Sequence, residues 1–571
     1  MRVLGSLCAA VVVLPVTVAA QVRAENLRTF PDRPVAWQEH DDLNVNGAPE
    51  KSHLQSLKVA LALRDQLSSE IDRIMSLDSR APAWDVNAAD EVPCSTWYCP
   101  RNHLHPMTPE EVVAGTGTAP PRLPLTITSG KSQGDAVGFE VLDADGRKFL
   151  VKIDRANHIG MTTGGEVIGN AVFHAAGYNV PGAHVLDLDP SDLRVDPRAT
   201  YLVYEVQRRP FTVSFLTSQL ALTDRLPNGR VRAVAIPWLE GQPLGGFDMT
   251  GTRRGDPNDR IPHQLRRSLR ASRLIYAWLS VLDPGPVNTL DTMVVDASGR
   301  RFVRHNLIDF SSAFGSATNY VQGLHQEGEY SIEVGRTLAA LFSLGIYQRP
   351  FQHRRAEYDV LVGNYTAVGY FPAETFNPDT YRQERKNPAF QRMTDRDAYW
   401  GAKVVTSFTD AQIEAMVQAA RLPDPDASFL THALKVRRDI LGRRYLRPMA
   451  AVETPQISAD GAQLCFDDLA VARGYVSPLE ARYEIGVRDV GPTKGASMST
   501  TQVQQAATGA HACVPIGGAG PGGGYRIVEI RTRLAASDGS PAGQLTKATR
   551  VHLRWRPDQG RFAVVGLERD E

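Results

Sequence analysis

The chain has few cysteines, no net charge and no long hydrophobic run after its first 20 residues. Five cysteines in 571 residues exclude a small disulfide-dense scaffold. Basic and acidic side chains number 63 each, so no overall field attracts nucleic acid or an anionic membrane, and we expect no nucleic-acid partner. The 42% of apolar residues excludes a disordered or collagen-like chain and is enough for several hydrophobic cores.

The first apolar run, Leu4 to Ala20, follows Arg2 and ends in the small residues Val18-Ala19-Ala20. This pattern predicts a secretory signal peptide over residues 1–20 with cleavage near Ala20, and therefore a secreted or periplasmic protein. The later apolar segments are shorter and are interrupted by charged residues. We therefore expect no transmembrane segment in the mature chain.

Four cysteines follow the predicted signal peptide, and their positions suggest two pairs, Cys94 with Cys99 and Cys465 with Cys513. Disulfides suit an oxidising compartment, and the second pair would stabilise more because it closes a longer loop. A zinc site is the alternative. It is not favoured, because C-x4-C followed by two distant single cysteines is no compact ligand spacing.

The apolar pattern predicts an α+β chain in five segments. These are a signal peptide (1–20), a helical and irregular extension (21–121) with one helix from Leu54 to Ile74, a strand-rich segment (122–241), a helical segment (242–450) and a β-sandwich (451–571). The third segment should hold strands at 138–142, 147–153, 200–206 and 232–236, and a helix at 166–176 after a Gly164-Gly165 turn.

The fourth segment should hold one hairpin and four helices. The hairpin strands are expected at 292–295 and 301–308, the helices at 265–279, 395–406, 410–420 and 428–446, and the last strands of the sandwich at 549–555 and 562–565. Arg266, Arg267, Arg270 and Arg273 surround the first of these helices. We expect them to form a solvated face rather than a site for an acidic substrate.

Lys152 lies near the end of a predicted strand, and Glu166 opens the helix that follows. A strand lysine that faces a helix glutamate positions a cation for nucleotide phosphates. Residues 127–134 are predicted as a turn with Gly130, Lys131 and Gly134, whose backbone N–H groups could cover those phosphates. A plain hairpin loop is the alternative, and the segment is not a Walker A motif.

A second group of polar residues follows the long predicted helix. Asp283 and Asn288 have the spacing D-x4-N, and Asp309 comes directly after an apolar strand. Asp283 could orient a hydroxyl nucleophile, and Asn288 and Asp309 could bind Mg²⁺ through oxygen atoms. A carboxylate after an apolar strand is costly unless a metal or a donor meets it.

Residues 123–450 resemble the protein-kinase-like fold in its atypical bacterial branch, which includes HipA, CotH and phosphoinositide-kinase relatives, and are similar to a group of exported bacterial proteins. The resemblance rests on Glu166-Val-Ile-Gly-Asn170, on His305-Asn-Leu-Ile-Asp-Phe310 and on Thr394-Asp-Arg-Asp-Ala-Tyr-Trp-Gly401. It implies a two-lobed core with a small β-rich N-lobe and a helical C-lobe, with ATP and Mg²⁺ as cofactors. The implied roles are a Lys152–Glu166 ion pair, catalytic Asp283, metal ligands Asn288 and Asp309, and a hinge over 238–241 that brings Glu240 near adenine.

The sequence departs from the kinase pattern at two positions near the site. Val281-Leu282 stand where His-Arg usually precedes the catalytic aspartate, and Ser311 replaces the glycine of D-F-G. No activation loop or A-P-E element is recognisable after Asp309, so the resemblance implies no peptide substrate.

These observations predict an exported, Mg²⁺-dependent phosphotransferase that acts on a protein, lipid or glycan hydroxyl group. The β-sandwich could bind a partner in the cell envelope. Two alternatives stay open. A silent kinase-like scaffold would explain export to a place where ATP is scarce, and an adenylyl transferase could use the same site with the nucleotide reversed.

Overall fold

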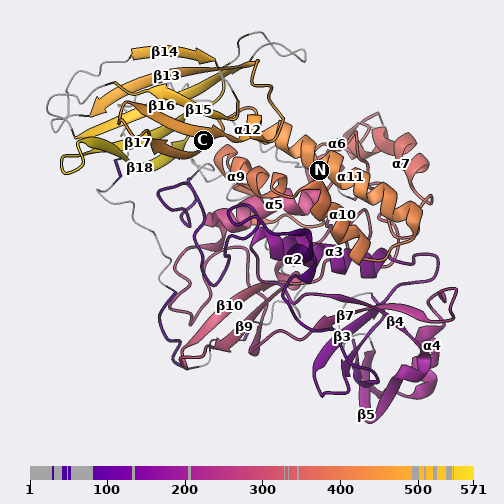
Figure 1. The fold of residues 1–571 in the computed structure, drawn as a ribbon. Coiled ribbons are helices and arrows are strands. Elements are labelled where there is room, and N and C mark those ends of the chain that lie inside the picture. Colours follow the sequence, from indigo (N-terminus) through magenta and orange to yellow (C-terminus); the bar gives the residue numbers. More distant parts are fainter. Residues whose placement is uncertain are drawn as a thin grey trace, which may run out of the picture.

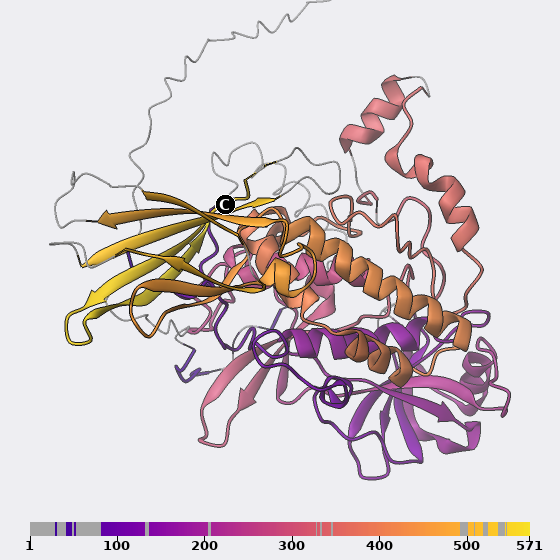
Figure 2. The same cartoon turned by 45° about the horizontal axis from the view of Figure 1, so that its top comes forward.

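A computed structural model describes residues 81–571, except 132–135, 204–206, 327, 332–333, 344–345, 491–500, 507–508, 518–523, 535–542 and 544, and also residues 29–30, 41–47, 49 and 51–52. The fold is α+β, as predicted: a mixed sheet lies at one end, antiparallel sheets lie at the other, and helices lie between them (Figures 1 and 2). The predicted signal peptide, the predicted helix from Leu54 to Ile74 and Gly134 lie outside the described residues. Among the helices described, none is long and apolar enough to cross a membrane, as expected.

Seven strands form the mixed sheet, purple in Figure 1. In spatial order they are β4 (His184–Leu188), β7 (Val231–Pro237), β3 (Lys148–Ile153), β2 (Gly138–Leu142), β1 (Leu125–Gly130), β5 (Leu193–Val203) and β6 (Gln207–Pro210). Only β1 and β5 pair in parallel. The predicted turn at 127–134 is wrong for residues 127–130, because these pair with β2 and β5 as part of β1.

Strand alternation separates two faces of this sheet. Phe149, Val151 and Ile153 of β3 belong to one hydrophobic core, so Lys152 between them points to the other face. Helix α3 (Met161–Ala176) covers that other face. The sequence pattern of β3 therefore decides which side of the sheet carries the lysine.

Helix α3 begins at Met161, so the prediction of a Gly164-Gly165 turn before the helix is wrong. Asp154, at the end of β3, caps the helix instead: its carboxylate accepts hydrogen bonds from the backbone N–H of Gly160 at 2.8 Å and of Thr163 at 2.9 Å. Because the capping side chain belongs to Asp154, the N-cap residue itself is Gly160, and the sequence has no Ser, Thr, Asp or Asn there to mark the start of the helix. The end of the helix at Gly177 agrees with the prediction.

The middle of the molecule is mostly helical, with one small sheet. Its three strands are β8 (Gln242–Gly245), β9 (Thr289–Val295) and β10 (Arg301–Leu307), and β9 and β10 are the predicted hairpin. The helices of this region are α5 (Arg267–Leu279), α6 (Val334–Phe342), α7 (Arg355–Leu361), α8 (Pro388–Gln391), α9 (Asp395–Thr406), α10 (Asp410–Ala419) and α11 (Asp424–Tyr445). Two short helices, α2 (Pro109–Ala114) and α4 (Val213–Leu220), belong to earlier segments. Helix α11 starts four residues before the predicted Ser428, because Pro423 and Pro425 are well suited to a helix N-terminus.

The arginines of α5 are mostly buried, so the predicted solvated face is wrong. Arg267 pairs with Asp397 at 3.1 Å and with Asp90 at 2.8 Å. Arg270 also reaches Asp397, at 3.3 Å, and Arg266 pairs with Asp259 at 2.9 Å. The charge pattern of one helix could not reveal this, because the acidic partners of Arg267, Asp90 and Asp397, come from distant segments.

Asp90 connects three parts of the chain. Besides Arg267 it pairs with Arg396 of α9 at 2.7 Å and with Arg569, in the last strand, at 2.5 Å. Burial opposes ionisation of Asp90, but the three guanidinium groups outweigh it and hold its pKa well below the usual value. Asp90, from the predicted N-terminal extension, thus joins helices α5 and α9 to the C-terminal sheets.

Two antiparallel sheets form the C-terminal segment, yellow and orange in Figure 1. They consist of β11 (Val452–Ile457), β12 (Gln463–Asp468) and β15 (His511–Pro515), and of β14 (Thr501–Ala506), β13 (Ala481–Val490), β16 (Tyr525–Leu534), β17 (Thr549–Arg556) and β18 (Arg561–Arg569), with the short helix α12 (Leu469–Ala472) after β12. The rings of Phe466 and Tyr483 join the two sheets at 5.2 Å. The predicted strands at 549–555 and 562–565 lie within β17 and β18, and the sulfur atoms of both predicted cysteine pairs lie at bonding distance.

Candidate functional site

Lys152 lies between two carboxylates that come from distant parts of the chain. Its Nζ is 2.5 Å from Oε1 of Glu166 and 2.9 Å from Oδ1 of Asp309. The side chains of Lys152 and Glu166 are each only 1% exposed, whereas that of Asp309 is 30% exposed. Asp309 is therefore the member of this group that a ligand from solvent can reach.

The three side chains shift each other's proton affinity. Burial favours the neutral lysine, but the charges of Asp309 and Glu166 outweigh it and raise the pKa of Lys152. Burial would raise the pKa of Asp309, but Lys152, Lys131 and the hydroxyl of Ser311 outweigh this effect. The pKa of Asp309 therefore lies well below the usual value. Burial raises the pKa of Glu166, and Lys152 opposes this change. At neutral pH the group therefore holds a charged lysine and an ionised Asp309.

Asp309 follows β10 in an unusual backbone conformation, with φ of 61°. This left-handed region is unfavourable for a residue with a side chain, and such strain persists only where the surroundings enforce it. Besides the ion pair with Lys152, Ser311 Oγ donates to its Oδ1 at 2.5 Å, and the N–H of the preceding Ile308 donates to the carbonyl of Asn288 at 3.0 Å. Ser311 therefore restrains the carboxylate where the kinase pattern has a glycine.

Phe310 anchors the same segment against α3. Its ring stacks on Phe173 with centroids 4.7 Å apart, and its N–H lies 3.4 Å from Oε2 of Glu166. A Cβ added at Gly169 would lie 2.4 Å from Cβ of Phe310, and one at Gly165 would lie 2.8 Å from its carbonyl oxygen. The glycines inside α3 therefore let Phe310, and with it Asp309, approach the helix.

We expect Gly169→Ala to damage the site without unfolding the chain. The added methyl group cannot fit beside Cβ of Phe310, so Phe310 and the neighbouring Asp309 must move away from α3. Overpacking of this kind destabilises by about 1–3 kcal/mol, which thermal unfolding would measure. Gly164→Ala is the matched control, because its methyl group meets only the end of the Leu422 side chain. An equal loss of thermal stability in both variants would contradict the anchoring role of Gly169.

Asp283 and Asn288 lie on the loop between α5 and β9. The Nδ2 of Asn288, at the end of the short helix η4 (Pro286–Asn288), donates to the backbone carbonyl of Asp283 at 2.7 Å, so its Oδ1 is the amide atom left to accept or coordinate. The N–H of Leu282 donates to the carbonyl of Ser312 at 3.2 Å. These bonds hold the Asp283 loop beside the 309–312 segment, and both Asp283 and Asn288 are half-buried.

The loop between β1 and β2 contributes Lys131, whose charge lowers the pKa of Asp309. Gly130 ends β1, and a Cβ there would lie 2.7 Å from Cβ of Tyr201, so packing alone requires this glycine. Residues 130–134 also match G-x-S-x-G. That motif marks a nucleophile only between a strand and a helix, and here β2 follows β1.

The predicted hinge, residues 238–241, connects β7 with β8 and so links the two sheets next to the site. Gly241 has φ of 92° and its backbone lies against the carbonyl of Met293. Glu240 pairs with Arg304 of β10 at 3.0 Å and its side chain is 66% exposed. The predicted contact of Glu240 with a nucleotide base has no support in these contacts and stays a prediction.

A cavity of about 270 Å³ lies along the neighbouring face of α3, lined among others by Val167, Asn170, His184 and Met416. It does not include Lys152 or Asp309. Asn170 connects it to the site, because its Nδ2 donates to the carbonyl of Glu166 at 2.8 Å and lies 3.4 Å from its carboxylate. Sequence reasoning missed Asn170, although its position four residues after Glu166 on a helix was a usable signal.

No family model, curated protein or solved structure matches this chain. The resemblance of residues 123–450 to kinase-like proteins therefore stays a prediction.

Proposed function

We propose that this chain is a Mg²⁺-dependent phosphotransferase of atypical protein-kinase-like fold, which transfers a phosphoryl group from ATP to a protein, lipid or glycan hydroxyl. The observation that carries the proposal is the position of Lys152 between Glu166 of α3 and Asp309 after β10, at 2.5 and 2.9 Å. A strand lysine paired with a helix glutamate, next to a metal-binding aspartate, is the arrangement that orients phosphates in kinases.

The order of the elements supports the same proposal. A β-rich part with helices α3 and α4 would be the N-lobe, and the helices with the β9–β10 hairpin would be the C-lobe, joined through residues 238–241. Lys131, on the loop between β1 and β2, would then cover the phosphates and contribute a positive charge. The buried, paired state of Lys152 keeps its ammonium charged for this role.

The side chains near Asp309 fit a hard cation. The carboxylate of Asp309 and the amide oxygen of Asn288 are ligands of the kind that Mg²⁺ prefers, and Asp309 keeps an exposed side. Asn288 and Asp309 would hold the ion, which would offset phosphate charge. Asp283 would accept the proton of the acceptor hydroxyl as general base.

The rest of the proposal concerns where the enzyme acts. We propose that residues 1–20 direct it to a secreted or periplasmic location, and that the C-terminal sheets bind an envelope partner near the acceptor.

Nucleotide binding gives the first test. ATP with Mg²⁺ at 100 times its dissociation constant should stabilise the protein by about 2.7 kcal/mol, which thermal unfolding would detect as a higher melting temperature. Incubation with ATP labelled at the γ- or the α-phosphate should then transfer only the γ label. Transfer of the α label would favour adenylyl transfer, and no shift with any nucleotide would favour a silent scaffold.

A further inference from the structure

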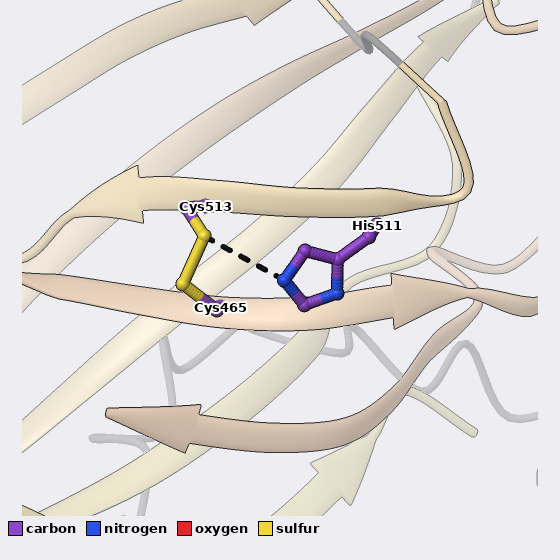
Figure 3. A group of neighbouring side chains, drawn as sticks. All are labelled: Cys465, His511 and Cys513. Atoms are coloured by element: carbon purple, nitrogen blue, oxygen red, sulfur yellow. Dashed lines mark hydrogen bonds between the residues drawn. A yellow bond between two sulfur atoms is a disulfide. The ribbon is translucent and has the colours of Figure 1, made fainter. Parts of the chain in front are cut away.

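Two residue pairs lie side by side across β12 and β15. Cys465 is directly opposite Cys513, and Asp467 is directly opposite His511. Residues two apart on a strand share a face, so the cysteine pair and the Asp–His pair project from the same face of this sheet. Figure 3 shows the ring of His511 beside the two bonded sulfur atoms.

The distances in this group are close to those of a metal site. The Nε2 of His511 is 3.8 Å from Sγ of Cys513, and the ligand atoms of the three residues lie within 4.8 Å of one another. Bond lengths to tetrahedral zinc separate a nitrogen and a sulfur ligand by about 3.6 Å, and two sulfur ligands by about 3.8 Å. His511 therefore already lies near ligand distance from Cys513, and the two bonded sulfur atoms would have to separate.

The other side of the His511 ring is held as in many metal sites. Its Nδ1 is 2.9 Å from Oδ1 of Asp467, and the hydroxyl of Thr454 donates to Oδ2 of Asp467 at 2.6 Å. Histidines that bind metals usually hydrogen-bond a carboxylate through the second nitrogen, which directs the lone pair of the first toward the ion. The side chains of His511 and Asp467 are 56% and 50% exposed, so an ion can enter from solvent.

We propose that reduction of the Cys465–Cys513 disulfide turns this face into a binding site for a thiophilic divalent cation such as Zn²⁺. A dithiol reductant supplies two electrons and two protons: its own sulfur atoms form a disulfide, and the Cys465–Cys513 bond becomes two thiols. The cation then binds both sulfur atoms and Nε2 of His511, the two thiol protons pass to solvent, and water completes the tetrahedron. Disulfide and metal exclude each other, so the oxidation state of this pair decides whether the site exists.

The proposal is independent of the phosphotransferase proposal, because these residues belong to the C-terminal sheets. The cysteine spacing did not favour zinc. The local sequence sign of this site is the His-x-Cys spacing of His511 and Cys513 in β15. It becomes a set of three ligands only because β12 places Cys465 opposite Cys513.

The test uses the full chain with Cys8, Cys94 and Cys99 replaced by serine, so that only the Cys465–Cys513 pair can be reduced. After reduction with a phosphine, which becomes its oxide, Co²⁺ alone is the probe. The reduced protein should show the visible absorption of tetrahedral, thiolate-bound Co²⁺ at one ion per chain, and Zn²⁺ should displace it. The oxidised protein should show none. Absence of this absorption after reduction overturns the proposal.

Variants distinguish Co²⁺ binding at the proposed site, which includes His511, from Co²⁺ binding to the two cysteine thiols alone. His511→Ala should weaken Co²⁺ binding to the reduced protein about tenfold or more, and Asp467→Asn should weaken it about 10–100-fold. His432→Ala is the matched control, because His432 is also exposed and paired with a carboxylate, Glu374, at 2.8 Å, and it should change nothing. If reduction unfolded the sheets, the thiols would bind Co²⁺ equally with and without His511, and that result also overturns the proposal.

Discussion

Asp283→Asn should abolish phosphoryl transfer while leaving nucleotide binding intact. A general base contributes about 10²–10⁴-fold to the rate, so transfer of the γ label should fall by that factor. The bond that orders the loop is preserved, because Asn288 donates to the backbone carbonyl of Asp283 and not to its carboxylate. The melting temperature, with and without ATP and Mg²⁺, should therefore stay close to that of the unmodified protein.

A control and a contrasting variant sharpen this experiment. Asp359→Asn removes an exposed carboxylate that pairs with Arg355 at 2.9 Å, and should keep full activity. Asp309→Ala should instead lose the Mg²⁺-dependent part of nucleotide stabilisation. Full transfer activity in Asp283→Asn would show that another group accepts the proton, and would remove the catalytic role proposed for Asp283.

The parts of the fold that follow from the sequence have local signals. The turn Ala144-Asp145-Gly146 joins β2 to β3, and Gly146 takes the positive φ of 79° that the turn requires. Thr394 and Thr409 cap α9 and α10 with side-chain hydrogen bonds to the first turn. Each of these signals lies within a few residues of the element that it begins or ends, so the element bounds were nearly correct.

The errors arise where distant residues decide the structure. The start of α3 depends on Asp154, which lies outside the helix just after β3, and the burial of Arg267 depends on Asp90 and Asp397. The parallel pairing of β1 with β5 could not be predicted either, because neither segment carries a local sequence pattern that indicates its partner strand. In the candidate site, Lys152, Glu166 and Asp309 could be predicted from the sequence, because each lies at the start or end of a predicted element. The structure brings these three residues together.

Lys152→Met should remove both stability and activity. It leaves Glu166 buried and facing Asp309 without the ammonium group between them. Removal of one partner from a buried ion pair typically lowers the free energy of unfolding by about 3–5 kcal/mol, which urea unfolding would measure. Phosphoryl transfer should fall to background, because the phosphates would lose the cation that Lys152 supplies.

The pH dependence of this loss follows from the two carboxylates. In the unmodified protein the low pKa of Asp309 adds stability that is present at neutral pH and is lost only below the ordinary carboxyl range, about pH 4. In Lys152→Met the buried Glu166, whose pKa burial already raises, should bind a proton. This proton adds stability at low pH that is lost as the pH rises, so the difference between the two proteins should shrink from pH 7 to pH 5.

A second substitution separates the structural from the catalytic role of Lys152. In Lys152→Met with Glu166→Gln the unpaired buried charge is gone, so most of the lost unfolding free energy should return, because replacing both partners of a buried pair is often nearly neutral. Activity should not return, since the phosphates would still lack their cation. Recovery of transfer activity together with stability would mean that Lys152 serves only the fold, and the phosphotransferase proposal would then lose its main support.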